Sequence, residues 1–293
     1  MHFQKLTWQD AACLRSFLPF LTGRECDPTP GCLMMWRDFC RMKYHTDGNS
    51  LYICLHDDSS TPHYALPISR DHAEAVQRLV KENKGSSPMC FTTIPESHVP
   101  MFEQLYPGCT VTPQRDYADY LYRAESLVTM AGRKLSGQRN QMSQFRRNHP
   151  DWSFEPVTPS DVPAVIAFLK ENFILDPSMD PVKRTEDLMA LDMLEHLDDC
   201  PLSGGMLTAE GHIFGFAFGE IIRDTLYVHI EKALRDEKGA YQMVVNHYSA
   251  MYAGDSRVQW INREDDNGDP GLRKTKLSYL PDRLLNKYLI TIP

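Results

Sequence analysis

The beginning of this chain returns, in diverged form, at its middle. Residues 3–18 align with residues 154–169 at a constant offset of 151, and five of the sixteen positions are identical. Self-similarity at a fixed offset outranks local propensity, because it identifies the structural unit itself. The unit here is about half the chain. The sequence therefore predicts two domains built on one plan and not a solenoid of short repeats.

Both copies of the repeat have the pattern of a short strand followed by an amphipathic helix. Thr7 and Thr158 each stand three residues before an aspartate, Asp10 and Asp161 respectively. Threonine is favoured at the N-cap of a helix, and a carboxylate near a helix N-terminus interacts favourably with the helix dipole. We expect the same capped helix start in both halves. A chance match between two ordinary strand–helix openings is the alternative.

Hydrophobic periodicity gives the two halves a similar order of elements. In the first half we expect strands at 51–55, 63–68, 89–93 and 109–121, helices at 71–84 and 96–105, and a turn at 57–60. A basic helix follows at 137–148. In the second half we expect helices at 187–197, 240–252 and 270–279, and strands at 204–208, 213–221, 225–231, 258–262 and 284–290.

This order predicts an α+β fold with two tandem domains, each a mixed, mainly antiparallel sheet flanked by helices. The predicted divisions are an N-terminal domain at 1–125, a basic connecting helix at 126–150 beside an interdomain cleft, and a C-terminal domain at 151–293. Alternation along the strand 225–231 places His229 and Glu231 on the same face. The first domain carries few marked polar motifs, so we expect the functional residues in the second.

Composition restricts the class of protein. The apolar content of 42% and charged content of 24% are typical of a globular protein. No segment approaches the roughly 20 apolar residues of a membrane span, and the N-terminus lacks the apolar core of a signal peptide. We therefore expect a cytoplasmic chain without integral membrane association.

The cysteines follow neither a disulfide nor a zinc pattern. There are eight, irregularly spaced and without a CxxC pair, and seven lie in the first half. Tetrahedral zinc sites and disulfide frameworks have more regular spacing, so thiols in a reducing compartment and no metal are expected. A metal site at Cys26, Cys32 and Cys40 is the weaker alternative.

The net charge of −8 disfavours unspecific nucleic-acid binding by the whole surface, but the basic residues are unevenly distributed. Residues 126–150 include five arginines or lysines and no acidic residue. A second basic cluster spans 273–287, with Asp282 as its single carboxylate. These clusters predict a local anion site. Solvated helix faces that pair with acidic neighbours explain either cluster equally well.

Four polar stretches stand out in the sequence. They are Gly132-Arg133-Lys134 with Arg139-Asn140, His229-Ile230-Glu231-Lys232 with Lys238-Gly239-Ala240-Tyr241, Asn262-Arg263-Glu264, and residues 271–279 with the sequence GLRKTKLSY. In combination they resemble the family named after the C-terminal region of bacterial phosphatidylglycerol lysyltransferases. More closely, they are similar to its soluble stand-alone members of largely unassigned function. This family is related to the Fem-type aminoacyltransferases. The resemblance is strongest between residues 120 and 279. It implies two tandem GNAT-like (acyl-CoA N-acyltransferase) domains, with a ligand site in the second domain and the interdomain cleft.

The resemblance directs attention to the helix start at 235–241. In a GNAT-like domain the pyrophosphate of acyl-CoA lies on such a helix N-terminus, where free N–H groups and the helix dipole favour an anion. The pattern Q/R-x-x-G-x-G/A is broken in this chain. Counting from Arg235 puts Lys238 at a glycine position, and counting back from Gly239 puts Asp236 and Tyr241 at unsuitable positions. We expect acetyl-CoA to fit poorly, although Lys238 could hold one phosphate or carboxylate.

Three residues are candidates for catalysis. Glu231 or His229 could act as a general base, and Tyr279 falls where many GNAT enzymes place a tyrosine acid. Each also has a structural explanation: Glu231 paired with Lys232 or Arg263, His229 as a satisfied core histidine, and Tyr279 as a packed helix-end tyrosine.

The remaining candidates are polar residues suited to binding an anionic group. Arginine can hold a phosphate or carboxylate through two parallel hydrogen bonds, as Arg133 and Arg139 could do from the basic helix. A structural network would account for the Asn262–Glu264 segment equally well. The predicted binding residues are Arg133, Lys134, Arg139, Asn140, Lys238, Gly239, Tyr241, Asn262, Arg263, Glu264, Arg273 and Lys274.

The leading functional hypothesis is a transferase that moves an acyl or aminoacyl group to an amine or hydroxyl. No cofactor is certain. Acyl-CoA and aminoacyl-tRNA are the candidate donors, so the expected partners are an anionic small molecule or such a donor, including tRNA. The rival hypothesis is a non-catalytic protein that binds or senses a small molecule on a degenerate GNAT pair. The broken phosphate-binding pattern favours this rival.

Overall fold

The computed structural model describes residues 1–55, 61–83, 88–175, 181–254 and 257–293. The chain divides into two compact units. The first unit comprises residues 1–119, 265–270 and 284–293, and the second comprises residues 120–264 and 271–283. The first unit thus includes two segments from the second half of the chain, 265–270 and 284–293, and the second unit begins within the last strand expected for the first half. The predicted turn at 57–60 and the predicted last residue of the helix 71–84 lie outside the described residues.

The first unit is built on a sheet with the strand order β1-β2-β3-β4-β6-β15-β7, and β5 pairs with β3. Its strands are β1 (Gln4–Lys5), β2 (Lys43–Thr46), β3 (Ser50–Leu55), β4 (His63–Tyr64), β5 (Ile68–Ser69), β6 (Met89–Pro95), β7 (Thr110–Pro113) and β15 (Lys287–Ile292). Its helices are α1 (Ala11–Ser16), α2 (Pro30–Trp36), α3 (His72–Glu82) and α4 (Val99–Leu105), with 3-10 turns η1 (Trp8–Asp10), η2 (Leu18–Phe20), η3 (Glu96–His98) and η4 (Arg115–Tyr117).

The second unit is built on a sheet with the order β14-β8-β13-β12-β11-β10-β9. Its strands are β8 (Asp119–Arg123), β9 (Ser153–Pro156), β10 (Ser203–Ala209), β11 (His212–Ile222), β12 (Thr225–Ala233), β13 (Trp260–Asn262) and β14 (Arg283–Leu285). Its helices are α5 (Ala124–Thr129), α6 (Ser136–Asn148), α7 (Val162–Leu169), α8 (Pro181–Glu195), α9 (Ala240–Ala253) and α10 (Pro270–Ser278), with a 3-10 turn η5 (Arg133–Leu135) and a π-helical turn η6 (Lys170–Ile174).

The internal repeat is visible in the topology. Read from β1 and from β9, the two sheets have the same strand order, and each contains a parallel pair at the matching place, β4 with β6 and β12 with β13. The same polar contact also opens both halves. The Asp10 Oδ2 atom accepts hydrogen bonds from the Thr7 amide and hydroxyl, both at 2.8 Å. In the second copy Asp161 Oδ2 accepts them from Thr158 at 2.9 and 2.6 Å. The same threonine–aspartate contact thus recurs in both copies. Thr7 is the N-cap of the turn η1 as predicted, but the N-caps of α1 and α7 are Asp10 and Asp161, so the predicted N-cap role of Thr158 is wrong.

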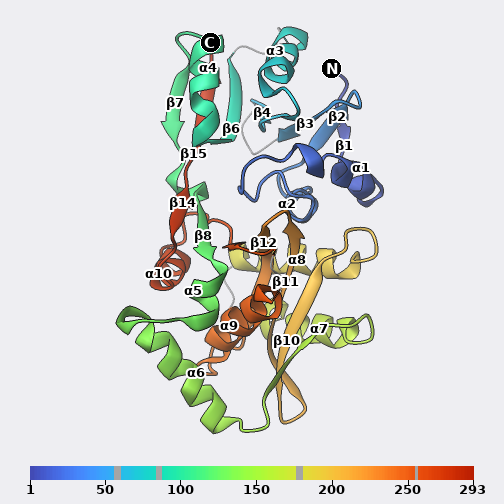
Figure 1. Ribbon diagram of the computed structural model, residues 1–293. Coiled ribbons are helices and arrows are strands. Elements are labelled where there is room, and N and C mark those ends of the chain that lie inside the picture. Colours follow the sequence, from blue (N-terminus) through green and yellow to red (C-terminus); the bar gives the residue numbers. More distant parts are fainter. Residues whose placement is uncertain (56–60, 84–87, 176–180, 255–256) are drawn as a thin grey trace. The chain divides into compact units, whose positions relative to one another are not determined.

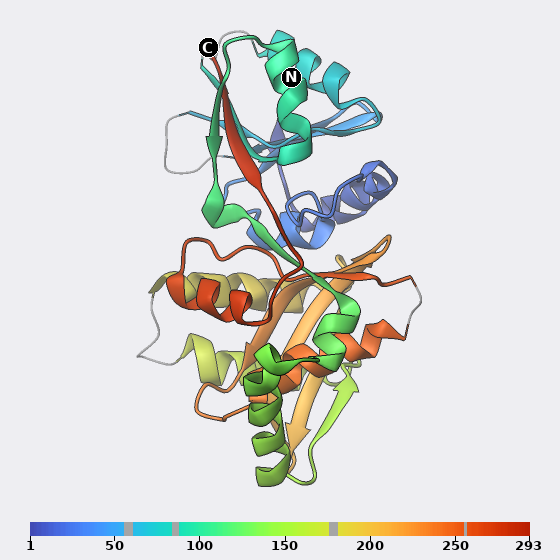
Figure 2. The same ribbon diagram turned by 60° about the vertical axis from the view of Figure 1, so that its left-hand side comes forward.

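The two halves exchange one strand. The strand that follows β7 along the chain is β8, which lies in the second sheet between β13 and β14. The strand that follows β14 is β15, which lies in the first sheet between β6 and β7. Figures 1 and 2 show β15, in red, running between the green and teal strands of the first unit. Its Ile290 and Ile292 belong to the core that also contains Leu79 of α3 and Phe102 of α4.

This exchange corrects two strand predictions. The predicted strand 109–121 is divided into β7 and β8 by the turn η4, and the predicted strand 284–290 is divided into β14 and β15 at Asn286. At both breaks, the backbone is fixed by hydrogen bonds to residues of the first unit that are distant in sequence. Gln114 Oε1 accepts a hydrogen bond from the Thr93 amide at 2.8 Å, and the Asn286 carbonyl accepts one from the Glu96 amide at 3.1 Å. Hydrophobic periodicity cannot reveal such breaks, because both sides of each break are strands.

The described helices include none that is both long and apolar enough to cross a lipid bilayer.

Candidate active site

The polar centre of the second unit lies where two neighbouring strands stop pairing. The parallel strands β12 and β13 pair from Thr225 and Trp260 to Tyr227 and Asn262. There β13 ends, while β12 continues to Ala233. The side chains that follow the last pair fill the widening space between the strands. The buried polar residues His229 and Arg263 follow that pair on the two strands.

Arg263, the first residue after β13, is the centre of this cluster. The whole residue is 3% exposed, and its Nη2 atom donates hydrogen bonds to Oε2 of Glu231 and, at 2.7 Å, to the Tyr241 hydroxyl. The Tyr241 hydroxyl donates in turn to Oε2 of Glu231 at 2.8 Å. Burial raises the pKa of Tyr241 well above its usual value, so this hydroxyl remains a donor. Hydrogen bonds thereby join Glu231 of β12, Arg263 after β13 and Tyr241 of α9 into one network.

Several hydrogen-bonding positions in this network are unused. Within the described residues, Nε and Nη1 of Arg263 are buried and form no hydrogen bond, whereas the buried hydroxyl of Tyr279 interacts with the Gln242 side chain. The known contacts of Glu231 all use Oε2, which leaves Oε1 without a hydrogen bond to the described part of the chain. Buried donors are normally paired, so unpaired ones at one place indicate a group that is absent from the folded chain alone.

Aromatic rings surround the Arg263 guanidinium. Its central carbon lies 4.8 Å from the ring centre of Tyr279 and 5.7 Å from those of Tyr122 and Tyr241. Such rings stabilise a cation through their quadrupoles and exclude water from it. Lys276 of α10 fixes the backbone beside it. Its Nζ donates to the Arg263 carbonyl at 2.6 Å, and its own carbonyl accepts from the Tyr122 hydroxyl at 2.7 Å.

His229 does not have a free ring nitrogen. It is the extra residue of a β-bulge in β12, because Gly219 pairs with Val228 and Phe218 with Ile230. Nδ1 lies 2.7 Å from Oε1 of Glu264, and Nε2 lies 3.2 Å from Oε1 of Glu220. Burial alone would lower the pKa of His229, but its hydrogen bonds and charge interactions with the two carboxylates raise it to about 9.

An imidazolium between two carboxylates cannot accept a proton at neutral pH. It suits a positioning role better than the predicted role of general base. The residue that it holds, Glu264, has a left-handed backbone with φ of +56° and follows Arg263 directly. The Glu264 amide is also held by Asn262 Oδ1 at 2.7 Å. Asn262 and His229 together therefore fix the conformation of the chain on either side of Arg263.

A second ion pair, which the sequence analysis did not include, lies next to Glu231. Nζ of Lys232 lies 2.9 Å from Oε1 of Glu186 and 2.5 Å from Oδ1 of Asp187, both on α8. The interaction satisfies Lys232, which was one expected partner of Glu231. Glu186 and Asp187 have no motif of their own, since they look like ordinary polar positions of an amphipathic helix.

The N-terminus of α9 is in contact with α6. Gly239 has a φ of +91°, and a β-carbon at this position would lie 2.1 Å from the Gln141 carbonyl oxygen and 3.0 Å from Cβ of Phe145. Glycine is needed here because another helix passes this close. Figures 1 and 2 show α6 beside α9. At Gly239 the Gln141 carbonyl of α6 therefore lies close against the backbone at the start of α9.

The remaining predicted residues lie outside the network around Arg263. Arg139 Nη1 donates to the Met130 carbonyl and, at 2.8 Å, to the Gly132 carbonyl, so it holds the turn before α6. Of the other predicted binding residues outside this network, Arg273 is half-buried. The exposed ones are Arg133, Lys134, Asn140, Lys238 and Lys274. The structure thus brings together Glu231, His229, Tyr241, Asn262, Arg263, Glu264 and Tyr279 from the predicted set. The predicted interdomain cleft stays a prediction.

A groove of about 500 Å³ opens elsewhere on the second unit. It is lined by residues of α7 and η6, by the start of β11 and by residues 234 and 237. None of the predicted site residues lines it.

Two sheets of the same strand order, each with a parallel central pair and an exchanged strand, define a tandem GNAT-like protein. FemX has this fold, with a TM-score of 0.59 at 9% identity over 100% of this chain and 97% of that chain. The sequence matches the family described as phosphatidylglycerol lysyltransferase, C-terminal, over residues 20–291. The chain belongs to this family.

The chain is also similar to individual proteins. A conserved protein of unknown function from Bacteroides thetaiotaomicron VPI-5482 is 28% identical, with a TM-score of 0.86 over 99% of both chains. The structure of L-PGS from Bacillus licheniformis is 13% identical, with a TM-score of 0.66 over 95% of this chain and 90% of that one. An uncharacterised protein of Mycoplasmoides gallisepticum is 22% identical over 179 residues, which are 59% of this chain and 56% of the relative.

Proposed function

We propose that this protein is an aminoacyltransferase whose reaction centre is the Glu231–Arg263–Tyr279 cluster of the second unit. Its family and its fold suggest a GNAT-like aminoacyl or acyl transferase. The choice of centre rests on one observation: the unpaired buried N–H groups of Arg263, with the Tyr279 ring against the guanidinium, stand beside the unpaired Oε1 of Glu231.

Acyl transfer needs donors for a developing oxyanion. An amine or hydroxyl attacks the carbonyl carbon of an ester, and negative charge builds up on the carbonyl oxygen before the ester bond breaks. N–H and O–H groups that are already oriented in a water-poor site stabilise that charge strongly. Nε and Nη1 of Arg263 and the hydroxyl of Tyr279 fulfil this requirement. Burial raises the pKa of Tyr279 above its usual value, which keeps its proton in place as a donor.

The attacking amine or hydroxyl must lose a proton, and Glu231 is placed to accept it. Oε2 is held by Arg263 and Tyr241, which fixes the direction of the carboxylate. Oε1 is left to receive the proton from the nucleophile. The imidazolium of His229 acts through Glu264 on the backbone around Arg263 and does not contact the substrate.

The contact between α6 and α9 favours an aminoacyl ester over acyl-CoA as the donor. The Gln141 carbonyl occupies the space at Gly239 that a pyrophosphate would need. Conversely, Arg133, Lys134 and Arg147 are exposed on η5 and α6, and no ion pair is known for them within the described residues. Exposed cations without an ion pair on η5 and α6 suit the phosphates of a tRNA, because phosphate contacts position a nucleic acid without reading its sequence.

The experiment is a transfer assay with hydroxylamine as a surrogate nucleophile, so that the natural acceptor need not be known. Purified protein is mixed with unfractionated aminoacyl-tRNA or with acetyl-CoA, and the hydroxamates are identified by mass spectrometry. The expected result is protein-dependent aminoacyl hydroxamate from charged tRNA, above the uncatalysed background, and no acetyl hydroxamate.

Each other outcome contradicts a definite part of the proposal. Turnover of acetyl-CoA refutes the assignment of the donor. Binding of charged tRNA without hydroxamate formation supports the non-catalytic alternative. Neither binding nor turnover refutes the aminoacyltransferase.

A further inference from the structure

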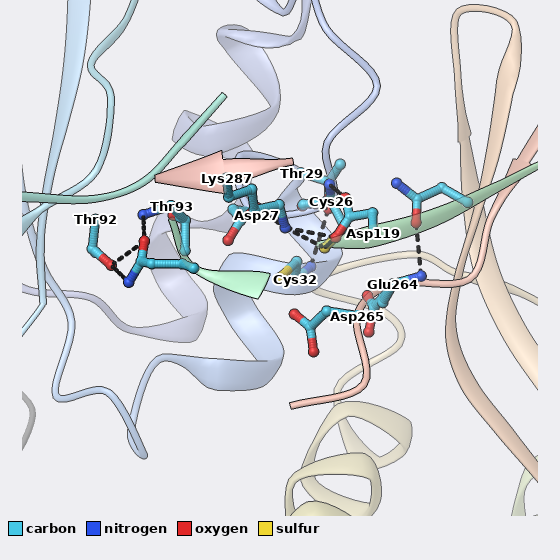
Figure 3. Close-up of polar contacts among 12 residues, drawn as sticks. Cys26, Asp27, Thr29, Cys32, Thr92, Thr93, Asp119, Glu264, Asp265 and Lys287 are labelled. Atoms are coloured by element: carbon cyan, nitrogen blue, oxygen red, sulfur yellow. Dashed lines mark hydrogen bonds and ion pairs between the residues drawn. The ribbon is translucent and has the colours of Figure 1, made fainter. Parts of the chain in front are cut away.

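The first unit contains a charged cluster around a fully buried lysine that the proposed reaction does not use. Lys287, the first residue of β15, has a side chain with no exposed surface, and its Nζ lies 2.6 Å from Oδ1 of Asp119 and 2.5 Å from Oδ2 of Asp27. The Cys26 amide donates to Oδ2 of Asp119 at 2.7 Å. Figure 3 shows the Lys287 ammonium directed toward Asp119 and the sulfur of Cys26. The cluster resembles a cation site, but the Lys287 ammonium already supplies the positive charge.

Two cysteines outside any disulfide meet at this cluster. The Sγ atoms of Cys26 and Cys32 lie within 4.8 Å of each other, and neither cysteine is in a disulfide. The turn between them is held by Thr29, which is fully buried. Its hydroxyl donates to the Cys26 carbonyl at 2.7 Å and accepts from the Cys32 amide at 3.3 Å. One side chain therefore fixes the backbone at both cysteines. Cys40, the third member of the predicted alternative metal site, does not join them among the described residues.

The two thiols differ in exposure and surroundings. Cys32 is partly exposed, whereas Cys26 is buried, with its thiol donating to Oδ1 of Asp119 at 3.3 Å and accepting from Lys287 Nζ at 3.8 Å. The contact with Cys32 and burial raise the pKa of Cys26 well above its usual value. Cys26 is therefore shielded from solvent oxidants and stays protonated next to a carboxylate, while Cys32 can be reached from outside.

We propose that Cys26 and Cys32 form a site of reversible oxidation by hydroperoxides, in which Cys32 reacts with the oxidant and Cys26 closes a disulfide. The proposal does not depend on the transferase function. It rests on the distance between the sulfurs, the turn held by Thr29, the unequal exposure of the thiols, and the proton acceptor beside Cys26.

The chemistry balances in two steps. In the first, with hydrogen peroxide as the oxidant, the sulfur of Cys32 takes one oxygen, the O–O bond breaks, and a sulfenic acid and one water form; an organic hydroperoxide leaves an alcohol in place of this water. In the second, the sulfur of Cys26 attacks the sulfur of Cys32 and the S–O bond breaks. The Cys26 thiol proton passes through the Asp119 carboxylate to the departing hydroxide, which leaves as a second water. The sulfur of Cys26 carries negative charge during the attack, and the Lys287 ammonium stabilises it.

The test treats the full-length reduced protein with hydrogen peroxide and follows it by intact mass and by peptide mapping under non-reducing conditions. The expected product has lost two hydrogen atoms and contains a peptide pair linked through Cys26 and Cys32. Dithiothreitol restores the original mass. The Cys109→Ser variant is the control, since Cys109 is also partly exposed, and it should form the same link.

Variants of the two cysteines separate the steps. Cys32→Ser should form no link. Cys26→Ser should accumulate the sulfenic acid of Cys32, which dimedone traps, followed by sulfinic acid. In Asp119→Asn the closing step should slow by about tenfold or more, because the proton acceptor is lost. The proposal is overturned if the parent protein remains unoxidised, if Cys32 is oxidised to sulfinic acid without a link, or if the link joins other cysteines.

Discussion

The buried imidazolium of His229 predicts a definite pH dependence of stability. Its folded pKa of about 9 lies above the ordinary value of 6.5, because two carboxylates hold the charged form. A shift of this size corresponds to about 3 kcal/mol of free energy of unfolding. The sign follows from the direction of the shift. The contribution is fully present below about pH 6.5 and is lost as the pH rises through about 9, where the folded state finally gives up the proton.

The pKa shift of His229 determines how much the free energy of unfolding changes over an accessible range of pH. Between pH 7 and pH 9 the free energy of unfolding should fall by about 2 kcal/mol through His229 alone. In the His229→Gln variant a side-chain amide replaces the imidazole ring, and this amide does not titrate. It should be less stable than the parent at pH 7, and its stability should change less between pH 7 and pH 9.

The assay is urea unfolding of both proteins at several pH values, followed by fluorescence and circular dichroism. His98→Gln is the matched control, because burial lowers the pKa of His98 to about 4 and its titration falls outside the range. Parallel pH profiles for the parent and the His229 variant would refute the reasoning. They would mean that the ring is not held as an imidazolium by Glu220 and Glu264.

Two further predictions concern α6. Gly239→Ala should lower the free energy of unfolding by more than about 3 kcal/mol, from the left-handed backbone and the contact with α6. Gly137→Ala, whose β-carbon would meet no atom within 4 Å, should stabilise α6 by up to about 1 kcal/mol. Equal effects in chemical denaturation would contradict the packing of α6 against α9. In filter binding, Arg147→Gln should weaken charged-tRNA binding and reduce the salt slope by about one. An unchanged slope would remove Arg147 from the tRNA surface.

The repeat made most of the fold predictable, because the same threonine–aspartate turn and the same element order occur in both halves. The exchange of β8 and β15 was not predictable in this way. A strand has the same apolar pattern whichever sheet receives it, and the breaks at η4 and Asn286 are fixed by contacts with residues distant in sequence. Pairing between distant strands is a property of the folded chain and leaves no local pattern.

The candidate site was predictable in part. Arg263, Glu231 and Tyr279 stood out as polar residues near strand and helix ends, and the structure joins them. The role of His229 was not predictable, because its two partners come from β11 and from the loop after β13 and its position in a bulge breaks the alternation. Lys276 carried a positive charge like its neighbours Arg273 and Lys274. Only the packing of α10 in the structure shows that Lys276 is the one of these three basic residues that is buried.

The most direct test of the proposed reaction centre is the rate of aminoacyl hydroxamate formation from charged tRNA by Glu231→Gln relative to the parent protein. The glutamine keeps the shape of the side chain but cannot accept the proton of the nucleophile. The predicted result is a fall of about 100-fold in rate with unchanged tRNA binding. Glu155→Gln, the same change at an exposed position of β9, serves as the control and should keep the parent rate. A Glu231→Gln protein as fast as the parent would contradict the assignment of this cluster as the reaction centre.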